Sequence, residues 1–392
     1  MRRIGIGATA LACVLTAGAA QAQEKIKVGV TATLEGTYTI LGVDGIAGFN
    51  AAVKKYGGKA GGKELEFVIA STDATPDSAI RAVKNFSMTH PELTFINSAS
   101  GAQQTTFPDA SPNFFRFNMD GAQWSAGLGD YAFNKKGYKK VAIVGEDYSF
   151  SHTQAAGFIL EFCGLGGQIT SRQWVPLGTK DFASTIAALP DDVDAVYLNL
   201  GGADAVNFLN QYSQAGGKGH LMGGSIMVDQ TVLSAKGDAK KAMIGTLASS
   251  GMADSDQDPA WLAFVKLYQE TTPADKRLPS PGLLATNYYG ATMALFEALN
   301  KVNGDLSDNQ SKFKDALAHL TIDAPNGQIS LDENRQAIGQ NFVTEVVEDA
   351  NGNLISKVVK TVPGVHQTLG YPRDVFAKIG PPGRTNPECK KY

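Results

Sequence analysis

Short apolar runs alternate along this chain with stretches whose apolar positions recur at helical spacing. The apolar and β-branched runs predict strands over residues 26–30, 65–70, 93–96, 141–144 and 195–198. Helical patterns fill intervals between them, over residues 45–56, 78–86, 153–163 and 203–215. Strands that alternate with helices indicate parallel sheets with right-handed crossovers, and two such series predict two doubly wound α/β lobes.

The last third of the chain departs from this alternation. Two long helices are predicted over residues 259–271 and 283–302. Residues 342–347 and 354–359 then alternate around the turn signal Asp-Ala-Asn-Gly, which predicts a β-hairpin. Beyond residue 362 the chain is rich in Pro, Gly and charged residues, so we expect a tail that wraps the surface.

Composition narrows the classes of function. The chain has 392 residues and a formal net charge of −3, which gives no sign of a nucleic-acid partner. Three Cys and five scattered His cannot form a disulfide scaffold or a four-thiolate zinc site. No nucleophile elbow, Walker A loop or dinucleotide-binding fingerprint follows a predicted strand. We therefore expect no metal or cofactor, and the sequence gives little support for catalysis.

The N-terminus has the pattern of a secretory signal peptide. Arg2 and Arg3 precede an apolar stretch over residues 4–18, and Ala20-Gln21-Ala22 offers a small-residue cleavage site. The apolar stretch is shorter than the ~20 residues that span a bilayer. We expect cleavage of residues 1–22 after Ala22 and export to the periplasm. In that oxidising compartment Cys163 and Cys389 either pair or remain two separate thiols.

Three loops follow predicted strands, at the sheet edge where α/β proteins usually bind ligands. Residues 97–102 offer small side chains, hydroxyls and backbone N–H groups suited to a carboxylate, or form a plain turn. Residues 146–150 bring two aromatic rings, which either stack on a ligand or fill the core. Residues 223–226 are rich enough in glycine for a ligand to approach the backbone closely, or they form an ordinary glycine-rich loop. Arg116 either binds a carboxylate or joins one lobe to the other.

A series of ordered landmarks runs along the mature chain. They are Val28-Gly-Val-Thr-Ala-Thr-Leu34, Asn113-Phe-Phe-Arg-Phe117, Tyr138-Lys-Lys-Val-Ala-Ile-Val-Gly-Glu-Asp-Tyr148, Thr179-Lys-Asp-Phe182 and Gly201-Gly-Ala-Asp-Ala205. In order and spacing they resemble the leucine/isoleucine/valine-type periplasmic binding proteins of ABC importers, over nearly all of residues 25–365.

The resemblance implies two lobes joined by three crossover strands, closing on a small molecule. It divides the chain into residues 23–118 plus 252–327 for the first lobe, residues 119–251 plus 328–362 for the second, and a tail over residues 363–392. It also implies a monomer that delivers its ligand to an inner-membrane ABC permease.

Two departures from the family pattern bear on the ligand site. Amino-acid-binding members carry a glutamate for the ligand's ammonium where this chain has Ser225. The chain is closer to the subgroup that binds benzoates and hydroxycinnamates, unless Asp229 or Asp147 supplies the charge for a branched-chain amino acid. The ligand-binding residues that we expect are Ser98, Ser100, Gly101, Ala102, Tyr148, Phe150, Gly202 and Ser225. A secreted α/β enzyme is the alternative of another class.

The second departure is a shortage of chain in the first lobe. Between residues 86 and 116 there is room for about one strand–helix unit where family members have two. Either an inner strand is missing or two strands have merged, and a missing strand would leave a hole in the sheet.

Overall fold

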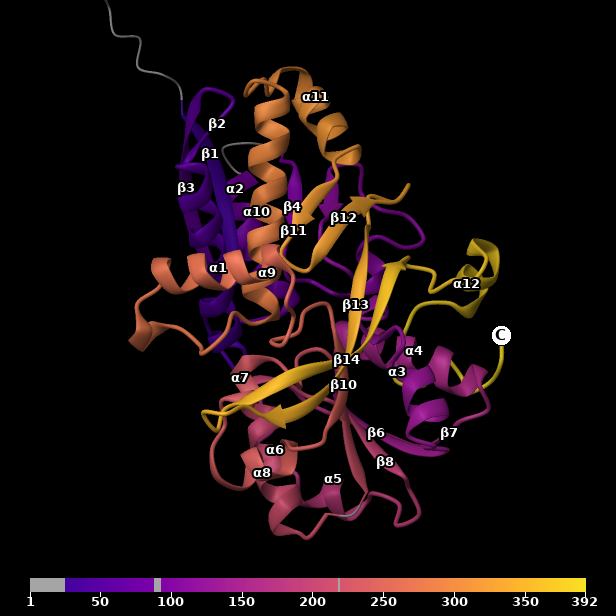
Figure 1. Ribbon diagram of the computed structural model, residues 1–392. Coiled ribbons are helices and arrows are strands. Elements are labelled where there is room, and N and C mark those ends of the chain that lie inside the picture. Colours follow the sequence, from indigo (N-terminus) through magenta and orange to yellow (C-terminus); the bar gives the residue numbers. More distant parts are fainter. Residues whose placement is uncertain (1–24, 88–92, 218) are drawn as a thin grey trace, which may run out of the picture.

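The computed structural model describes residues 25–87, 93–217 and 219–392, so the predicted signal peptide lies outside the described residues. Figure 1 shows two α/β lobes, one above the other, with two long strands running between them. No helix in the described ranges is long and apolar enough to cross a membrane.

The first lobe, at the top of Figure 1, begins with a small sheet in the order β1-β3-β2. β1 (Ile26–Thr33) pairs in parallel with β3 (Lys63–Thr72), and β2 (Lys59–Ala60) pairs antiparallel with β3. The predicted strands at 26–30 and 65–70 are therefore confirmed and are longer than expected. The helices of this lobe are α1 (Thr39–Tyr56), α2 (Pro76–Ser87), α9 (Pro259–Thr271), α10 (Leu283–Lys301) and α11 (Ser307–Ala318).

Helices α1 and α10 pack against each other at very short range. A Cβ atom on Gly48 of α1 would lie 2.0 Å from the carbonyl oxygen of Ala285 in α10, so only glycine permits this approach.

Helix α9 has a defined N-terminus. Asp258 caps it by accepting a hydrogen bond of 2.8 Å from Ala260 N, and Pro259 occupies the first turn. The predicted bounds of α9 agree with the observed ones.

The sheet of the first lobe is broken. β4 (Phe95–Asn97) pairs in parallel with β5 (Phe114–Arg116), and among the described residues neither strand joins β1. The predicted strand at 93–96 is present as β4, and its bounds are slightly later than predicted. Among the described residues, the chain between α2 and β5 contains this one strand, and residues 88–92 lie outside the described residues.

The second lobe is built on the largest sheet, in the order β11-β12-β13-β10-β9-β8-β6-β7 with β14 beside β13. The two strands that the sequence predicted here are confirmed, and residues 141–144 and 195–198 within them are fully buried. The parallel strands of the sheet are β6 (Lys140–Glu146), β7 (Gln168–Val175) at the edge, β8 (Ala195–Asn199), β9 (His220–Gly223) and β10 (Leu247–Ser250). The helices are α3 (Leu128–Asp130), α4 (Ser149–Gly164), α5 (Ala183–Ala187), α6 (Gly202–Gln214), α7 (Gln230–Leu233) and α8 (Gly237–Met243).

The predicted hairpin is confirmed and forms the long link between the lobes. β13 (Ala337–Glu348) and β14 (Leu354–Val365) pair antiparallel across the turn at 349–352. β13 also pairs with β10 and with β12 (Gly327–Leu331), which carries β11 (Ile322–Ala324) at the edge. The nine strands of this sheet therefore extend from the second lobe to the first, as Figure 1 shows.

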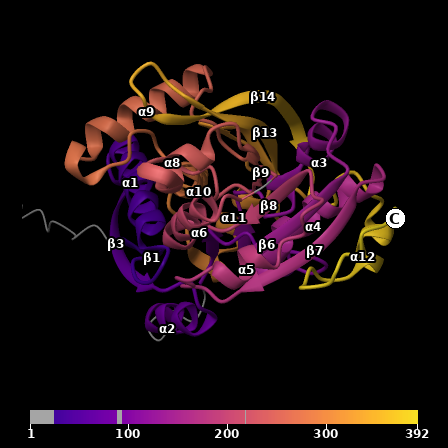
Figure 2. The ribbon, with the colours of Figure 1, turned by 90° about the horizontal axis from the view of Figure 1, so that it is seen from below.

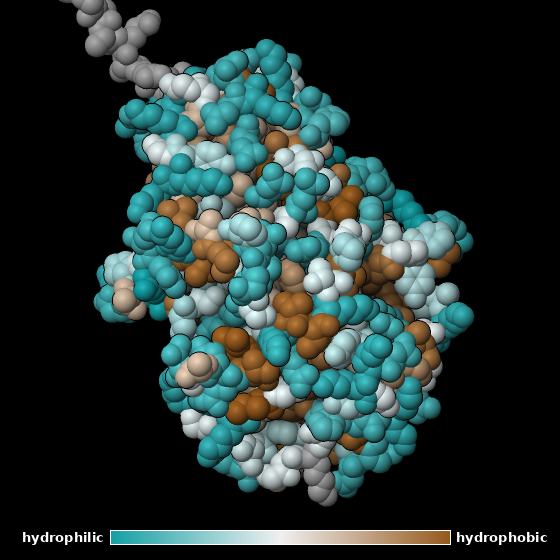
Figure 3. Space-filling view, in the orientation of Figure 1, coloured by the Kyte–Doolittle hydropathy of each residue, from teal (hydrophilic) through white to brown (hydrophobic). Residues whose placement is uncertain are grey.

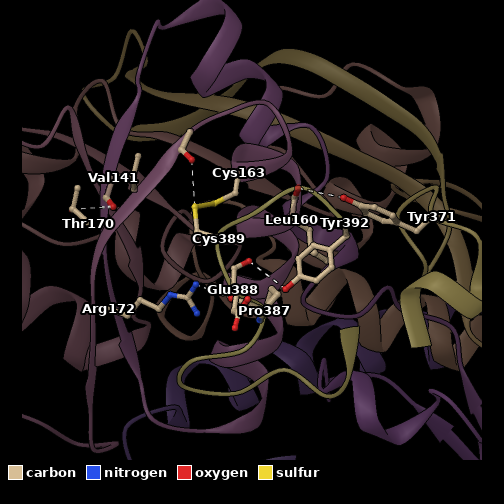
Figure 4. Close-up of a disulfide and its surroundings, with 11 residues drawn as sticks. Val141, Leu160, Cys163, Thr170, Arg172, Tyr371, Pro387, Glu388, Cys389 and Tyr392 are labelled. Atoms are coloured by element: carbon tan, nitrogen blue, oxygen red, sulfur yellow. Dashed lines mark hydrogen bonds between the residues drawn. A yellow bond between two sulfur atoms is a disulfide. The ribbon is translucent and has the colours of Figure 1, made fainter. Parts of the chain in front are cut away.

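The tail after β14 returns to the second lobe and is covalently attached there. Cys389 forms a disulfide with Cys163 of α4, with an S–S distance of 2.08 Å. The neighbouring hydrogen bond from Arg172 to Pro387 O, 2.7 Å long, is drawn in Figure 4. Figure 2 shows the C-terminus and α12 (Arg373–Ile379) beside α4 and β7. The pairing alternative for the two cysteines is the one that the structure contains.

On the face shown in Figure 3, polar residues predominate and apolar residues occur in small groups separated by polar ones.

Candidate functional site

Four aromatic rings meet where the loops of the two lobes face each other. Tyr38 precedes α1, Tyr148 precedes α4, and Phe150 lies in the first turn of α4. The ring centroids of Tyr38 and Tyr148 are 6.2 Å apart, and those of Tyr148 and Phe150 are 5.9 Å apart. Trp124 extends the series, at 5.9 Å from Phe150. We call these four rings the aromatic cluster.

Gly101 lies directly against this cluster. A Cβ atom there would be 2.7 Å from Phe150 and 3.0 Å from Trp124, so a side chain at this position would displace a ring. The Gly101 carbonyl accepts a hydrogen bond of 2.8 Å from Gly121 N, which holds the loop in place. The structure therefore brings Gly101, Tyr148 and Phe150 together, as the ligand-site prediction requires.

A buried carboxyl group lies beside the two tyrosines. Glu146, at the end of β6, accepts a hydrogen bond from Tyr38 Oη and another of 3.3 Å from Gly201 N. Tyr148 Oη in turn donates to Tyr38 Oη over 3.1 Å. Burial, and secondarily the negative charge of Asp204, raises the pKa of Glu146 to about 8. At neutral pH this group is therefore largely a neutral acid that can both donate and accept hydrogen bonds.

Gly202 also lies near Glu146 and Tyr38, at the start of α6. Its φ is +51°, and a Cβ atom would lie 2.6 Å from Thr37 O, so this position favours glycine. Nearby, Thr37 Oγ1 donates to Asp204 Oδ1 over 2.8 Å. The segment 37–38 is thus bonded to β6 and α6 through Glu146 and Asp204, which connects the first lobe to the second.

Ser225 lies deeper in the second lobe and is buried. Its Oγ accepts a hydrogen bond of 2.8 Å from Gln154 Nε2 of α4. The Gln154 Oε1 and Asn199 Oδ1 atoms beside Gly224 have no hydrogen-bond partner among the residues that the structure describes. Ser225 has no negative charge to offer an ammonium group, as the resemblance implied.

The remaining predicted residues lie in the loop that precedes η1 (Gln103–Thr105). Ser98 lines a separate cavity between β1 and β4, where it hydrogen-bonds with Tyr288. The carbonyls of Ser100 and Ala102 accept hydrogen bonds of 3.3 and 2.7 Å from Arg116 Nη1. After residue 102 the chain forms a single 3₁₀ turn, η1.

The side chain of Arg116 is occupied by contacts within the protein. Besides these two carbonyls, its guanidinium donates to Thr105, Thr106 and Gln336 and lies 3.6 Å from Asp120. Burial lowers its pKa to about 10. With its donors engaged, Arg116 holds the loop before β5 to the start of β13, and the carboxylate-binding alternative loses its support.

Both acids considered as substitutes for the missing glutamate are also engaged. Asp229 accepts hydrogen bonds from Thr231 N and Leu283 N, at 3.0 and 2.5 Å. Asp147 pairs with Arg384 of the tail and lies 3.1 Å from His152 Nε2. Neither carboxylate is free to accept a ligand's ammonium group.

Sequence reasoning missed Tyr38, Trp124 and Glu146. Glu146 stands in a loop that the sequence did single out, and its position directly after a fully apolar strand is a signal of burial. Tyr38 and Trp124 follow no predicted strand, so nothing local in the sequence marks them. Within the described part of the chain, no three His, Cys, Asp or Glu side chains are grouped to hold a metal ion.

The sequence matches the family model described as periplasmic binding protein over residues 91–353. A curated relative, the Leu/Ile/Val-binding protein homolog 6 of Brucella melitensis biotype 1, is 24% identical over 396 residues, covering 92% of this chain and 97% of the relative.

Solved structures resemble the fold as well. A solute-binding protein of an ABC transporter from Rhodopseudomonas palustris BisB5, in complex with 3,4-dihydroxybenzoic acid, superposes with a TM-score of 0.77 at 23% identity, covering 88% of this chain and 98% of that one. A leucine-binding protein from Thermotoga maritima superposes with a TM-score of 0.73 at 19% identity, covering 86% and 99%.

The fold is therefore that of the type I periplasmic binding proteins. Proteins of this kind bind small solutes, work with ABC permeases and are exported to the periplasm. With the family model matching well over half of its length, this chain belongs to the periplasmic binding protein family.

Proposed function

We propose that this protein captures a small aromatic carboxylate, of the benzoate or hydroxycinnamate type, between its lobes and delivers it to an ABC permease. The observation that carries the proposal is the aromatic cluster, with Tyr148 and Phe150 against the backbone of Gly101. Rings at these separations can be rearranged around a flat ligand ring, and such stacking contributes about 1 kcal/mol per pair.

The charges of the site support an acid rather than an amino acid. Ser225 stands where amino-acid-binding relatives have a glutamate, and Asp147 and Asp229 are already bonded. A ligand ammonium buried without a counter-charge would cost several kcal/mol. The similarly folded protein in complex with 3,4-dihydroxybenzoic acid supports the same ligand class.

The proposal includes the mature chain and its lobes. Residues 1–22 are removed as a signal peptide, residues 23–118 plus 252–327 form the first lobe, and residues 119–251 plus 328–362 form the second. Ser98, Ser100, Gly101, Ala102, Tyr148, Phe150, Gly202 and Ser225 remain the proposed ligand contacts, with Tyr38 and Glu146 added.

Calorimetric titration with benzoate, 4-hydroxybenzoate, 4-hydroxycinnamate and leucine tests the proposal. We expect binding of at least one aromatic acid and none of leucine. Replacing Phe150→Ala should weaken that binding by about tenfold, because the ring loses both stacking and apolar contact. The matched control, Phe133→Ala, removes a ring that packs on Phe162 away from the cluster and should leave the affinity unchanged. Binding of leucine alone would refute the aromatic ligand.

A branched-chain amino acid is the second candidate, and the buried Glu146 is the observation that favours it. No cation among the described residues pairs with this carboxyl group, so a ligand ammonium would find a partner there. Glu146→Gln separates the candidates: it should abolish leucine binding if the ligand is an amino acid, and retain benzoate binding if it is not.

A further inference from the structure

Two buried carboxyl groups, one from each lobe, meet at the start of α10. Asp44 belongs to α1 of the first lobe and Asp229 precedes α7 of the second, and Figure 1 shows these helices in the upper and the lower lobe. A Cβ atom on Gly282, the residue before α10, would lie 2.7 Å from Asp44 Oδ2 and 2.6 Å from Asp229 Oδ2. The two oxygen atoms therefore flank the same point, and the lack of a side chain at residue 282 lets them approach each other.

Backbone N–H groups at the start of α10 bond to the two acids, one to each. Gly282 N donates to Asp44 Oδ2 over 2.9 Å, and Leu283 N donates to Asp229 Oδ2 over 2.5 Å. The first bond lies within the first lobe, whereas the second connects the two lobes. The positive end of a helix dipole corresponds to about half an elementary charge, so this terminus compensates one carboxylate better than two.

The other titratable groups around the pair do not compensate a second negative charge. Tyr268 of α9 donates to Asp44 Oδ1 over 2.7 Å, and burial raises the pKa of this tyrosine, so it stays neutral. Asp254, between β10 and α9, is a third acid near Asp229 and accepts a hydrogen bond of 2.9 Å from Ser356 of β14. Among the described residues, no Lys, Arg or His forms an ion pair with any of these three acids.

Burial makes two adjacent negative charges unfavourable where the lobes meet. Asp44 and Asp229 are only 3% and 1% exposed, so water screens neither of them. Burial, and secondarily the charge of Asp229, raises the pKa of Asp44 from its ordinary value of 3.8 to about 7, and burial also raises the pKa of Asp229. The pair therefore holds a proton at acidic pH and loses it as the pH rises through about 7.

We propose that the contact between the lobes is linked to a proton: Asp44 and Asp229 share one proton while the lobes are together, and loss of that proton favours their separation. Separation breaks the bond from Leu283 N to Asp229 and exposes both carboxylates to water, where each ionises at its ordinary pKa. The stabilisation of the contact is thus fully present below pH 3.8 and is lost as the pH rises to about 7. The pair lies outside the aromatic cluster, so this device does not depend on the ligand proposed above.

Hydrogen exchange of the whole mature protein, without added ligand, tests the proposal. The Leu283 amide exchanges when its bond to Asp229 opens, so its protection factor should fall at least about tenfold between pH 5 and pH 7 and change little above pH 8. The Thr286 amide donates to Gly282 O over 3.1 Å within the first lobe. Separation of the lobes leaves this helical bond intact, so Thr286 should keep its protection.

Neutral variants of the two acids identify the titrating groups. Asp44→Asn and Asp229→Asn each leave a single carboxylate, which can stay ionised beside the start of α10. In either variant the protection of Leu283 should therefore change less than about twofold between pH 5 and pH 7. The control Asp258→Asn replaces an exposed acid that caps α9, where asparagine caps equally well, and should behave like the wild type.

Three outcomes would overturn the proposal. The first is a protection factor of Leu283 that is the same at pH 5 and pH 7. The second is an equal loss of protection at Thr286, which would mean that the end of α10 frays while the lobes stay together. The third is a pH dependence as strong as that of the wild type in either Asp variant, which would assign the titration to Glu146, another buried acid between the lobes.

Discussion

Glu146 is the residue whose chemistry depends most on its surroundings. Its pKa of about 8 in the folded protein lies above its ordinary value of 4.5. The stability that comes from keeping it neutral is therefore fully present below pH 4.5 and is lost as the pH rises towards 8.

We predict that Glu146→Gln removes this pH dependence. Relative to the variant, the wild-type free energy of unfolding should fall by more than about 1 kcal/mol between pH 5 and pH 8. Urea denaturation at the two pH values measures the difference. Glu333→Gln, which changes an exposed carboxylate paired with Arg373, is the control and should show no such trend. Parallel behaviour of wild type and Glu146→Gln would contradict the burial of a neutral acid.

The sequence left the role of Arg116 open, and its neighbours in the structure show what its side chain does. Its side chain supports the loop at 100–106 and reaches Gln336 near the start of β13. We expect Arg116→Met to lower the free energy of unfolding by about 3–5 kcal/mol, because Asp120 loses its buried counter-charge. Chemical denaturation checks this expectation. A loss of ligand affinity without a loss of stability would instead return Arg116 to the ligand site.

At the scale of the elements, the disulfide-linked tail contacts the loop that carries Tyr148 and Phe150 of the aromatic cluster. Arg384 of the tail pairs with Asp147, the residue before Tyr148, and its carbonyl accepts a hydrogen bond of 3.0 Å from Trp174 Nε1. The Cys163–Cys389 disulfide closes a loop with a sequence separation of 226 residues.

Cys389→Ser should therefore destabilise the protein by about 2–4 kcal/mol and expose the tail to proteolysis. Thermal unfolding and limited trypsin digestion measure the two effects. A reducing agent should produce the same change in the wild type and none in a Cys163→Ser, Cys389→Ser double variant. Identical digestion patterns with and without the disulfide would show that the tail is held by its other contacts.

Elements with strong local periodicity were predictable, and the polar edge strand β7 was not. The buried strand at 141–144, the helix at 259–271 and the hairpin all appear where the pattern placed them. β7, over Gln168–Val175, was missed because its partly exposed residues are mostly polar; within the described ranges it is an edge strand that pairs only with β6.

At the scale of the whole molecule, the hydrogen bond from Thr37 to Asp204 helps to hold the lobes together. In a hinged protein, a ligand closes the lobes only through its preference for the closed state. A contact made between closed lobes therefore raises affinity without touching the ligand.

We predict that Thr37→Val shifts the protein towards an open form and weakens ligand binding about three- to tenfold. Calorimetry gives the affinity, and small-angle scattering should show a larger radius of gyration without ligand. Thr39→Val, which removes only a local bond to Gly36 O, is the control. Unchanged affinity and scattering in Thr37→Val would mean that this bond does not bias closure.

Periodicity and length along the chain were enough to predict the two α/β series, the hairpin before the tail and the shortage of chain in the first lobe. Which distant groups meet became visible only in the folded structure. It placed Tyr38 against Glu146 and Tyr148, joined Cys163 to Cys389, and directed Ser98 into the gap between β1 and β4. Contacts between residues so far apart depend on how helices and strands pack, and the local pattern of apolar and polar positions contains no record of that packing.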